Sequence, residues 1–537
     1  MPTLNWIGKE AVVNHHHEVP FHLLKDVPDL ACGQPGDGNL IVQGDNLVAL
    51  KALLPYYAGQ VKCIYIDPPY NTGNEGWAYN DNVNSPIIRE WLGKVVGKED
   101  ETLDLHDRWL CMMFPRLSLL RQFLREDGAI FISIDDNEVQ SLRYVMDELF
   151  GGNNFVTTII WQKIFAPKGS ARHFSENHDY VVCYAKHLDK WQRNLAPRGE
   201  KQDARYKNPD NDPRGPWISD NLTARNSYSL GIYAITCPSG RVISGPPKGT
   251  FYRFSDDKFK ELDRDNRIWW GKDGNNMPRL KRFRTDVQEG IVPESIWPHT
   301  EAGNTQEAKK QIIEVLHDSG AVFATPKPTR LLERIIRIAT NPGDLVLDSF
   351  AGSGTTGHAI LKVNQTAHDK EPRRFLLVEM EPKICSEITA ERVRRVAEGY
   401  KNAKGESVDG LGGGFRYCEL GEPLFDEGGK IRETVSFADL ARHVYFTETG
   451  EPLPRERVTK SPFIGECRGV GIYLLFNGIL GDKSASGGNV LTRSVLAKLP
   501  KFDGQKVIYC AGCLLGKDRL QAERILVRQT PYEIKVS

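Results

Sequence analysis

The sequence predicts an α/β fold in which helices cover a parallel sheet. Short β-rich apolar runs alternate with longer helical stretches over residues 40–161, and the same alternation returns from residue 329. Each region alone is too short for a complete doubly wound sheet, so we expect the two to form one sheet together. Ligands of such a sheet bind at the carboxyl ends of its strands.

The predicted elements follow one another in a regular order. In the first region strands and helices alternate at residues 40–43, 46–54, 61–67, 109–124 and 128–135. In the second region the order is helix, strand, helix, strand, helix, at residues 329–340, 344–350, a stretch after Gly357, 374–380 and 384–396. Between them, residues 165–320 are rich in Gly, Pro, Asn and Asp, which indicates a loop-rich inserted module. A Gly-rich stretch at 410–415 opens a final segment.

Composition limits the class of protein. A chain of 537 residues has room for about two to four domains. Its 40% hydrophobic and 26% charged residues exclude collagen-like, coiled-coil and wholly disordered proteins. The apolar run at 129–134 is far shorter than a membrane span and the N-terminus lacks a signal-peptide core, so we expect a cytoplasmic protein without membrane association. The ten scattered cysteines are expected to be free thiols.

A glycine-rich loop follows the strand predicted at 344–350. Gly352, Gly354 and Gly357 match the G-x-G-x-x-G pattern, whose glycines let the backbone approach a bound nucleotide closely. Glu379 ends the next strand, where an acidic side chain can bind ribose hydroxyls. This pattern leaves open a nicotinamide dinucleotide, S-adenosylmethionine, and a glycine-rich turn without a ligand.

The first region helps to separate these alternatives. A buried strand runs directly into Asp67-Pro68-Pro69-Tyr70. The two prolines hold the backbone extended and leave its carbonyls free to accept hydrogen bonds. A carboxylate, a carbonyl and an aromatic ring thus meet at a strand end, where they can bind the exocyclic amine of a flipped nucleobase. The reaction of a dehydrogenase does not require this set of groups. The alternative without a function is a Pro-Pro turn that ends the strand, with Tyr70 in the core.

In combination, residues 67–73 (DPPYNTG) and 350–356 (FAGSGTT) resemble the circularly permuted β class of amino-group DNA methyltransferases, in which the catalytic motif precedes the cofactor motif. Stretches at 267–283, 299–310, 444–450 and 529–536 resemble the modification subunits of type III restriction-modification systems. The resemblance implies a Rossmann-like, circularly permuted S-adenosylmethionine-dependent methyltransferase fold with an inserted target-recognition domain and a C-terminal α/β domain. It divides the chain into a first methyltransferase part (1–162), the recognition domain (163–320), a second methyltransferase part (321–409) and the C-terminal domain (410–537).

The resemblance also assigns the site. In the catalytic motif Asp67, Pro68, Pro69 and Tyr70, the Asp67 carboxylate and the Pro68 carbonyl would accept the hydrogens of the target amine, and Tyr70 would stack on the flipped adenine. The residues assigned to S-adenosylmethionine are Asp45, Lys327, Asp348, Phe350, Ala351, Gly352, Ser353, Gly354, Thr355 and Glu379. Methyl transfer to N6 of adenine would then rest on positioning and electrostatics, with no metal and no covalent intermediate. Asp rather than Ser at position 67 favours adenine by family analogy, and N4 of cytosine is the alternative.

Partners follow from the same resemblance: double-stranded DNA, a second copy of the chain, and a helicase-nuclease restriction subunit. The total charge does not indicate nucleic acid, because 70 basic residues balance 70 acidic ones. Two alternatives come from other classes: a non-catalytic DNA-recognition subunit of a defence complex, and a nicotinamide-dependent oxidoreductase. The intact catalytic motif argues against the first, and the second leaves that motif without a purpose.

Three other motifs have residue types that are typical of DNA or metal binding. Arg279, Lys281, Arg282 and Arg284 lie beside two tryptophans in the densest basic-aromatic patch, which we expect to contact DNA; a solvated basic loop is the alternative. No metal site is expected, because the His15–His17 tract is short and the Cys510-x-x-Cys513 pair lacks a second pair at zinc spacing.

Overall fold

The structure is a computed structural model, and it describes most of the chain. The described residues are 4–33, 38–72, 105–197, 203–287, 290–317, 323–366, 371–453, 461–476, 479–480 and 488–530. Gly73 of the DPPYNTG stretch and residues 531–536 of the stretch at 529–536 lie outside them.

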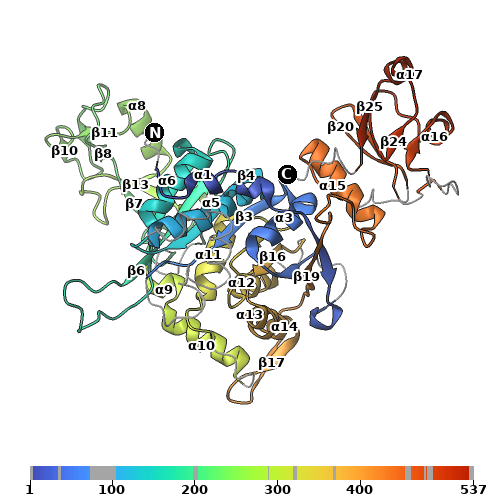
Figure 1. The fold of residues 1–537 in the computed structure, drawn as a ribbon. Coiled ribbons are helices and arrows are strands. Elements are labelled where there is room, and N and C mark those ends of the chain that lie inside the picture. Colours follow the sequence, from blue (N-terminus) through green and yellow to red (C-terminus); the bar gives the residue numbers. More distant parts are fainter. Residues whose placement is uncertain are drawn as a thin grey trace. The chain divides into compact units, whose positions relative to one another are not determined.

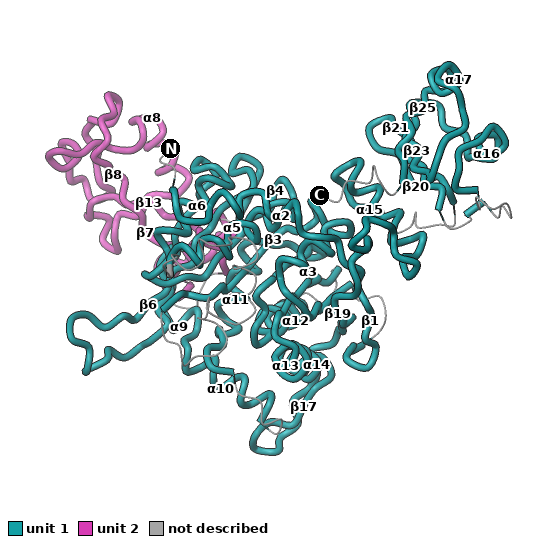
Figure 2. Tube along the Cα trace, viewed as in Figure 1, with its two compact units in different colours: residues 1–194, 294–537 teal, residues 195–293 magenta. Residues whose placement is uncertain are grey.

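A ten-stranded sheet forms the centre of the first compact unit, Met1–Asn194 with Glu294–Ser537 (Figures 1 and 2). Its strand order is β1 (His22–Asp26), β19 (Arg416–Pro423), β2 (Leu40–Gln43), β16 (Arg374–Glu379), β15 (Leu345–Asp348), β3 (Val61–Ile66), β4 (Leu124–Ile134), β6 (His178–Ala185), β5 (Phe155–Gln162) and β14 (Ile296–Trp297). The strands from β19 to β4 run parallel to one another, whereas β6 is antiparallel to both of its neighbours.

The two α/β regions of the sequence interleave in this sheet. β15 and β16, from the second region, lie between β2 and β3, from the first. The prediction of one shared sheet is therefore confirmed. So is the permuted order, because the strand before the catalytic motif, β3, precedes in sequence the strand before the glycine-rich loop, β15, and the two are hydrogen-bonded neighbours.

Helices cover both faces of the sheet. The apolar core on one face includes residues of α3 (Asn46–Tyr57), α5 (Leu105–Phe123) and α6 (Val139–Phe150), and the core on the other includes α10 (Thr305–Leu316), α11 (Thr329–Ala339), α12 (Thr355–Gln365) and α14 (Glu391–Glu398). Side chains of a strand alternate between faces, so Ile64 and Ile66 of β3 join the first core while Cys63 and Tyr65 join the second.

One predicted helix is interrupted. Residues 384–396 were expected to be a single helix, but α13 (Pro382–Ile384) passes into a π-helical turn, Cys385–Ala390, before α14 begins. The Thr389 hydroxyl donates to the Gly352 carbonyl of the glycine-rich loop at 2.5 Å, and its oxygen also lies 3.1 Å from the Ile384 carbonyl. Such π-helical turns occur often at functional sites, and this one packs against the loop.

The second compact unit spans Leu195–Pro293 and has its own small core around Tyr252, Phe259 and Trp270 (Figure 2). Its elements are a three-stranded sheet of β12 (Ile268–Trp269), β13 (Arg279–Phe283) and β7 (Trp217–Asn221), the short pairs β8 (Thr223–Ala224) with β11 (Phe251–Tyr252) and β9 (Ile235–Thr236) with β10 (Val242–Ile243), and α8 (Asp256–Arg264). The unit lies inside the predicted range 163–320, although β6 and β14 of that range belong to the main sheet. Its role in recognition stays a prediction.

The last part of the chain also has α/β character. A four-stranded sheet of β20 (Phe463–Cys467), β21 (Val470–Leu474), β23 (Gln505–Cys510) and β25 (Ile525–Gln529) accompanies α15 (Phe437–Thr449), α16 (Arg493–Lys498) and α17 (Lys517–Ala522). The remaining short elements are α1 (Lys9–Val12), α2 (His15–Glu18), α9 (His299–Ala302), β17 (Gly399–Lys401), β18 (Ser407–Asp409), β22 (Val490–Leu491), β24 (Gly512–Cys513) and 3-10 turns at Pro28–Leu30, Gly152–Asn154 and Arg284–Asp286. Among the described helices, none is long and apolar enough to cross a membrane.

Candidate active site

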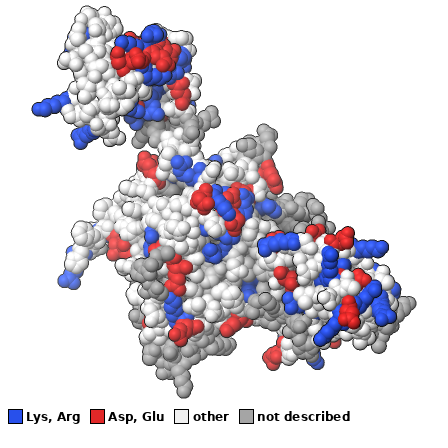
Figure 3. Space-filling model, turned by 90° about the horizontal axis from the view of Figure 1, so that it is seen from above, with Lys and Arg blue, Asp and Glu red and all other residues white. Residues whose placement is uncertain are grey.

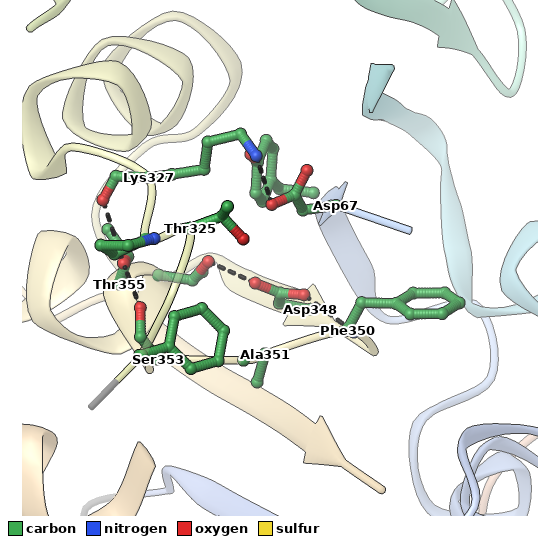
Figure 4. A pocket seen from close by; sticks show the side chains of 13 residues that line it. Asp67, Thr325, Lys327, Asp348, Phe350, Ala351, Ser353 and Thr355 are labelled. Atoms are coloured by element: carbon green, nitrogen blue, oxygen red, sulfur yellow. Dashed lines mark hydrogen bonds and ion pairs between the residues drawn. The ribbon is translucent and has the colours of Figure 1, made fainter. Parts of the chain in front are cut away.

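Two loops meet at the carboxyl ends of β3 and β15. The first begins at Asp67, directly after β3, and the second runs from Ser349 to Gly354, directly after β15. Because the two strands are neighbours, both loops line one small pocket of about 20 Å³, with Lys327 between them (Figure 4). The sheet therefore brings together the two motifs that the sequence singled out.

Asp348 fixes the start of the glycine-rich loop. Its carboxylate accepts a hydrogen bond from the Phe350 backbone amide at 3.0 Å and another from the Thr356 hydroxyl at 2.5 Å (Figure 4). The side chain is buried, and burial raises the pKa of Asp348 to about 7. Asp348 thus ties the end of β15 to the first turn of α12.

Glycine is required at two positions of this loop. Gly352 and Gly354 have φ angles of 48° and 71°, in the left-handed region that other residues avoid. A Cβ atom on Gly354 would lie 2.9 Å from the Thr389 carbonyl oxygen, and one on Gly352 would lie 2.9 Å from the ring of Phe323. The glycines therefore let the loop pass close to its neighbours.

Glu379 ends the neighbouring strand β16, where the sequence placed it, and contacts the glycine-rich loop without lining the small pocket. Its carboxylate accepts hydrogen bonds from the backbone amides of Gly352 and Glu381, at 2.8 and 2.9 Å. The group is buried at the end of β16, and desolvation raises the pKa of Glu379 to about 8. The acidic group is therefore joined directly to the glycine-rich loop.

Arg392, on α14, donates hydrogen bonds to the glycine-rich loop, and the sequence did not indicate this role. Its guanidinium donates to the Ser353 carbonyl, the Ser353 hydroxyl and the Thr355 hydroxyl at 3.2, 3.1 and 2.8 Å. The residue is fully buried, and desolvation lowers the pKa of Arg392 to about 10. No local pattern marks it, because it lies on α14, far along the chain from the loop.

Asp45 follows the carboxyl end of β2 but is not among the residues that line the small pocket, and its assignment to the cofactor stays a prediction. One carboxylate oxygen caps α3 by accepting from the amides of Leu47 and Val48, and the other pairs with the buried Arg116 at 3.0 Å. The adjacent Asn46 donates to the Ser349 carbonyl at 3.3 Å. The start of α3 is thereby attached to the glycine-rich loop.

Lys327 lies against the catalytic motif. Its ammonium donates to the Asp67 carboxylate at 2.5 Å and is 5.0 Å from the centre of the Tyr70 ring. Its own carbonyl accepts from the Thr355 hydroxyl at 3.2 Å. The sequence assigned Lys327 to the cofactor. The structure places it between the glycine-rich loop and Asp67, in the lining of the small pocket and of a larger cavity, and its assignment stays a prediction (Figure 4).

Two further contacts hold the catalytic motif. The Trp109 indole donates to the Pro69 carbonyl at 2.7 Å. Beyond Tyr70, Asn71 and His106 both bond to the same oxygen of the buried Glu138, at 2.6 and 2.8 Å. Asn71 has a φ of 59°, so the chain turns sharply here. Trp109 and Glu138 are thus supporting residues that the motif itself does not reveal.

A larger cavity of about 720 Å³ shares Asp67 and Lys327 with the small pocket. Its other lining residues include Pro68, Tyr70, Asp135, Trp161, Lys163, Asp179 and Lys309. Lys163 and the buried Asp179 pair at 2.5 Å, and desolvation raises the pKa of Asp135 to about 6. The lining of the larger cavity combines charged groups of both signs with the aromatic rings of Tyr70 and Trp161, a combination that suits a planar polar ligand.

The predicted DNA-binding patch is only partly exposed. Arg279, Arg282 and Arg284 are exposed, and the last two pair with Asp220 and Asp203. Lys281 does not fit the predicted contact. Its side chain is 1% exposed and its ammonium pairs with Asp210 and Asp212, because β13 turns Lys281 and Phe283 to the same inner face.

Two further expectations concern the charge and the metal-binding side chains of the described residues. Figure 3 shows Lys and Arg side chains interspersed with Asp and Glu over the face in view. In the part of the chain that the structure describes, no group of three or more His, Cys, Asp or Glu side chains could hold a metal ion. The side chain of Cys510 is buried and that of Cys513 is half-buried. In the His15–His17 tract, burial lowers the pKa of His16 to about 4.

Comparison with known proteins gives consistent matches. Residues 61–391 match the family N6_N4_Mtase, described as DNA methylase. The chain is 34% identical to the StyLTI Mod subunit of a type III restriction-modification enzyme from Salmonella typhimurium, over 73% of this chain and 62% of the relative. It is 31% identical to the EcoPI Mod subunit of Escherichia phage P1, over 83% of this chain and 74% of that protein.

Other relatives are more distant. The EcoP15I Mod subunit of Escherichia coli is 29% identical over 71% of this chain and 64% of its own length. The alignments thus span less than two thirds of the StyLTI and EcoP15I subunits. Among solved structures, the PvuII DNA methyltransferase (cytosine-N4-specific) aligns with 66% of this chain and 86% of its own, at 13% identity and a TM-score of 0.36.

Proposed function

Because this chain belongs to the N6_N4_Mtase family of DNA methylases, we propose that it transfers a methyl group from S-adenosylmethionine to the exocyclic amine of a base flipped out of duplex DNA. One observation carries the proposal. Asp67 and Lys327 lie on the boundary between the small pocket beside the glycine-rich loop and the larger cavity. A methyl donor in the first and a base in the second would therefore meet at Asp67.

The small pocket has the chemistry to hold S-adenosylmethionine. Glu379 presents a buried carboxylate at a strand end, suited to ribose hydroxyls, and the loop at Gly352 and Gly354 has backbone close to the pocket. Bound there, S-adenosylmethionine would supply a methyl group on a sulfonium: an amine can attack the methyl carbon, with the neutral thioether as leaving group. The Phe323 ring packs against Gly352 in the lining of this pocket.

The catalytic motif prepares the amine for attack. In a free base the lone pair of the amine is delocalised into the ring. When the Asp67 carboxylate and the Pro68 carbonyl accept its two hydrogens, the lone pair can point at the methyl group. Asp67 can also take the hydrogen that the nitrogen loses once the new bond has formed. Tyr70 lines the larger cavity, which supports its proposed role in stacking on the base.

Adenine N6 is the target that we propose, because position 67 is Asp. Cytosine N4 is the alternative, and base-resolved detection of the methyl group separates the two.

The names of the relatives support a role in a restriction-modification system, because they are Mod subunits of type III restriction-modification enzymes. We accordingly infer a restriction subunit as partner, with Arg279, Arg282 and Arg284 as DNA contacts. A dimer of this chain stays a prediction.

Substitution of Lys327 distinguishes two roles for this residue: a ligand of the cofactor, or a residue that positions Asp67. We expect Lys327→Met to lower the single-turnover rate of methyl transfer at saturating cofactor by about 10- to 100-fold, because a charge-assisted hydrogen bond to Asp67 is worth about 1.5–3 kcal/mol. The dissociation constant of the cofactor, measured by calorimetry, should change by less than about threefold. Lys327→Arg should retain most of the rate.

The ion pair of the half-buried Lys362 with Glu333, at 2.8 Å, offers a control. Lys362→Met removes a lysine of the same unit without touching either pocket, and should leave rate and affinity unchanged. If Lys327→Met weakened cofactor binding but left the saturated rate intact, Lys327 would be a cofactor ligand, as the sequence suggested, and not a positioning residue for Asp67.

Incubation with S-adenosylmethionine and duplex DNA of mixed sequence tests the proposed function. A methylated base in a defined sequence is the expected result, and cofactor binding without transfer to DNA is the opposing one.

A further inference from the structure

The loop of residues 163–177, between β5 and β6, carries an unusually exposed aromatic side chain. Phe174 is 91% exposed, the highest value among the exposed large apolar side chains of the described residues. Figure 1 shows this loop, hereafter the projecting loop, extending away from the sheet near β6. An isolated exposed apolar residue needs no explanation by itself, so its surroundings decide whether it has a role.

The projecting loop starts and ends at the larger cavity. Four of its residues line that cavity: Lys163, Ile164, Lys168 and Glu176. The same cavity is lined by Asp67 and Tyr70 of the catalytic motif. Phe174 is only two residues from Glu176 in the chain, so its backbone lies within about 7 Å of a residue that lines the cavity.

Hydrogen bonds across its base hold the projecting loop in shape. The amides of Lys163 and Ile164 both donate to the Asn177 carbonyl, at 2.9 and 3.2 Å. The Ser175 hydroxyl accepts from the Lys168 amide at 2.8 Å and donates to the Asn177 side chain at 2.5 Å. Ser175 is thus fixed directly beside Phe174, and a ring that is held out in advance costs less ordering on binding.

The charged side chains near the ring have the sign that DNA requires. Lys168, Arg172 and His173 are exposed on the projecting loop, and Glu176 is its one acidic residue. Basic groups on a short loop can contact the phosphates on either side of one base pair. An apolar ring flanked by such groups is typical of side chains that are inserted between base pairs.

We propose that the projecting loop enters the duplex at the target base pair and that Phe174 fills the space left by the flipped base. This inference rests on the proposed function. Flipping breaks the stacking of the target base on its neighbours, and that loss opposes the flipped state. The Phe174 ring stacks on the exposed neighbours in its place, while Lys168 and Arg172 bind the adjacent phosphates.

The test uses the full chain and a duplex that contains the methylated sequence found with the wild-type protein, with 2-aminopurine at the target position. S-adenosylhomocysteine replaces the methyl donor, so that the fluorescence rise reports flipping without reaction. Phe174→Ala should lower the flipped fraction and the single-turnover rate by about 5- to 100-fold, the range expected for loss of one base–aromatic stack. Phe174→Leu keeps an apolar side chain at this position, so its flipped fraction and single-turnover rate should lie between those of Phe174→Ala and the wild type.

A second substrate distinguishes the wedge from a general defect. When an abasic site faces the target base, flipping is already easy, so the abasic duplex should restore most of the Phe174→Ala rate. Leu514→Ala, which shortens another exposed apolar side chain, should leave rate and flipping unchanged. Equal flipping and equal rates for Phe174→Ala and the wild type would overturn the wedge but not the proposed function. A wild-type protein that neither methylates nor flips any base would overturn both.

Discussion

Asp67→Asn is expected to lower the rate of methyl transfer by about 10²- to 10³-fold, the usual cost of removing one group that stabilises developing charge. The amide has the shape of the carboxylate, but it cannot take the hydrogen that the amine loses, and it also breaks the ion pair with Lys327. Cofactor affinity should stay within about threefold of the wild type, because Asp67 serves the base. Single-turnover kinetics and calorimetry measure the two quantities separately.

Asp344→Asn provides a matched control. Asp344 is also a largely buried carboxylate in an ion pair, with Arg125 at 2.8 Å, but it precedes β15 at the opposite end of the sheet from the pocket. Its replacement should cost some stability and leave the saturated rate unchanged. Equal rates for Asp67→Asn and the wild type would contradict the assigned role of Asp67.

Gly354→Ala should have the second largest effect, on both stability and cofactor binding. A left-handed φ of 71° costs a non-glycine residue about 1–2 kcal/mol. The new Cβ would also lie 2.9 Å from the Thr389 carbonyl oxygen, a backbone atom that cannot rotate away. The loop must therefore shift, at about 1–3 kcal/mol more for overpacking. We expect a lower melting temperature and cofactor affinity weakened at least about tenfold.

Gly450→Ala separates the two causes. Gly450 has the same φ of 71°, but nothing lies within 4 Å of an added Cβ. Its substitution should lower the free energy of unfolding only by the cost of a left-handed φ at a non-glycine residue, and should leave cofactor binding unchanged. If both variants lost the same stability and both retained cofactor affinity, close packing of the loop on Thr389 would not be what makes Gly354 necessary.

Local patterns were sufficient to predict the centre of the fold. The strand, loop and helix around Gly352 combine an apolar run, left-handed glycines and a helical start within a few residues, and all three signals are short-range. The catalytic motif after β3 is equally local. Joining the two regions into one sheet followed from the length of each, and β15 is indeed paired with β3.

What the sequence could not reveal depends on contacts between distant residues. Lys327 and Asp67 are 260 positions apart, and no pattern couples them before the sheet forms. Arg392 reaches the loop only because α14 packs beneath it. β6 follows a polar loop, so its place in the main sheet was hidden by the change in composition at residue 163.

One misplaced residue was predictable in principle. Residues two apart in a strand share a face, so Lys281 should be grouped with the apolar Phe283. Counting charges along the segment overlooked this alternation. The partner carboxylates of Asp210 and Asp212, about 70 positions earlier in the chain, then explain how a lysine can be buried there.

The central claim is that a methyl donor beside Gly352 and a base beside Tyr70 meet at Asp67. The most direct test incubates the protein with S-adenosylmethionine and a mixed-sequence duplex, and then sequences the DNA with detection of modified adenines and cytosines at each position. N6-methyladenine confined to one short motif, and absent with Asp67→Asn, is the predicted result. Cofactor binding without any methylated base, or a methylated base that persists with Asp67→Asn, would contradict the claim.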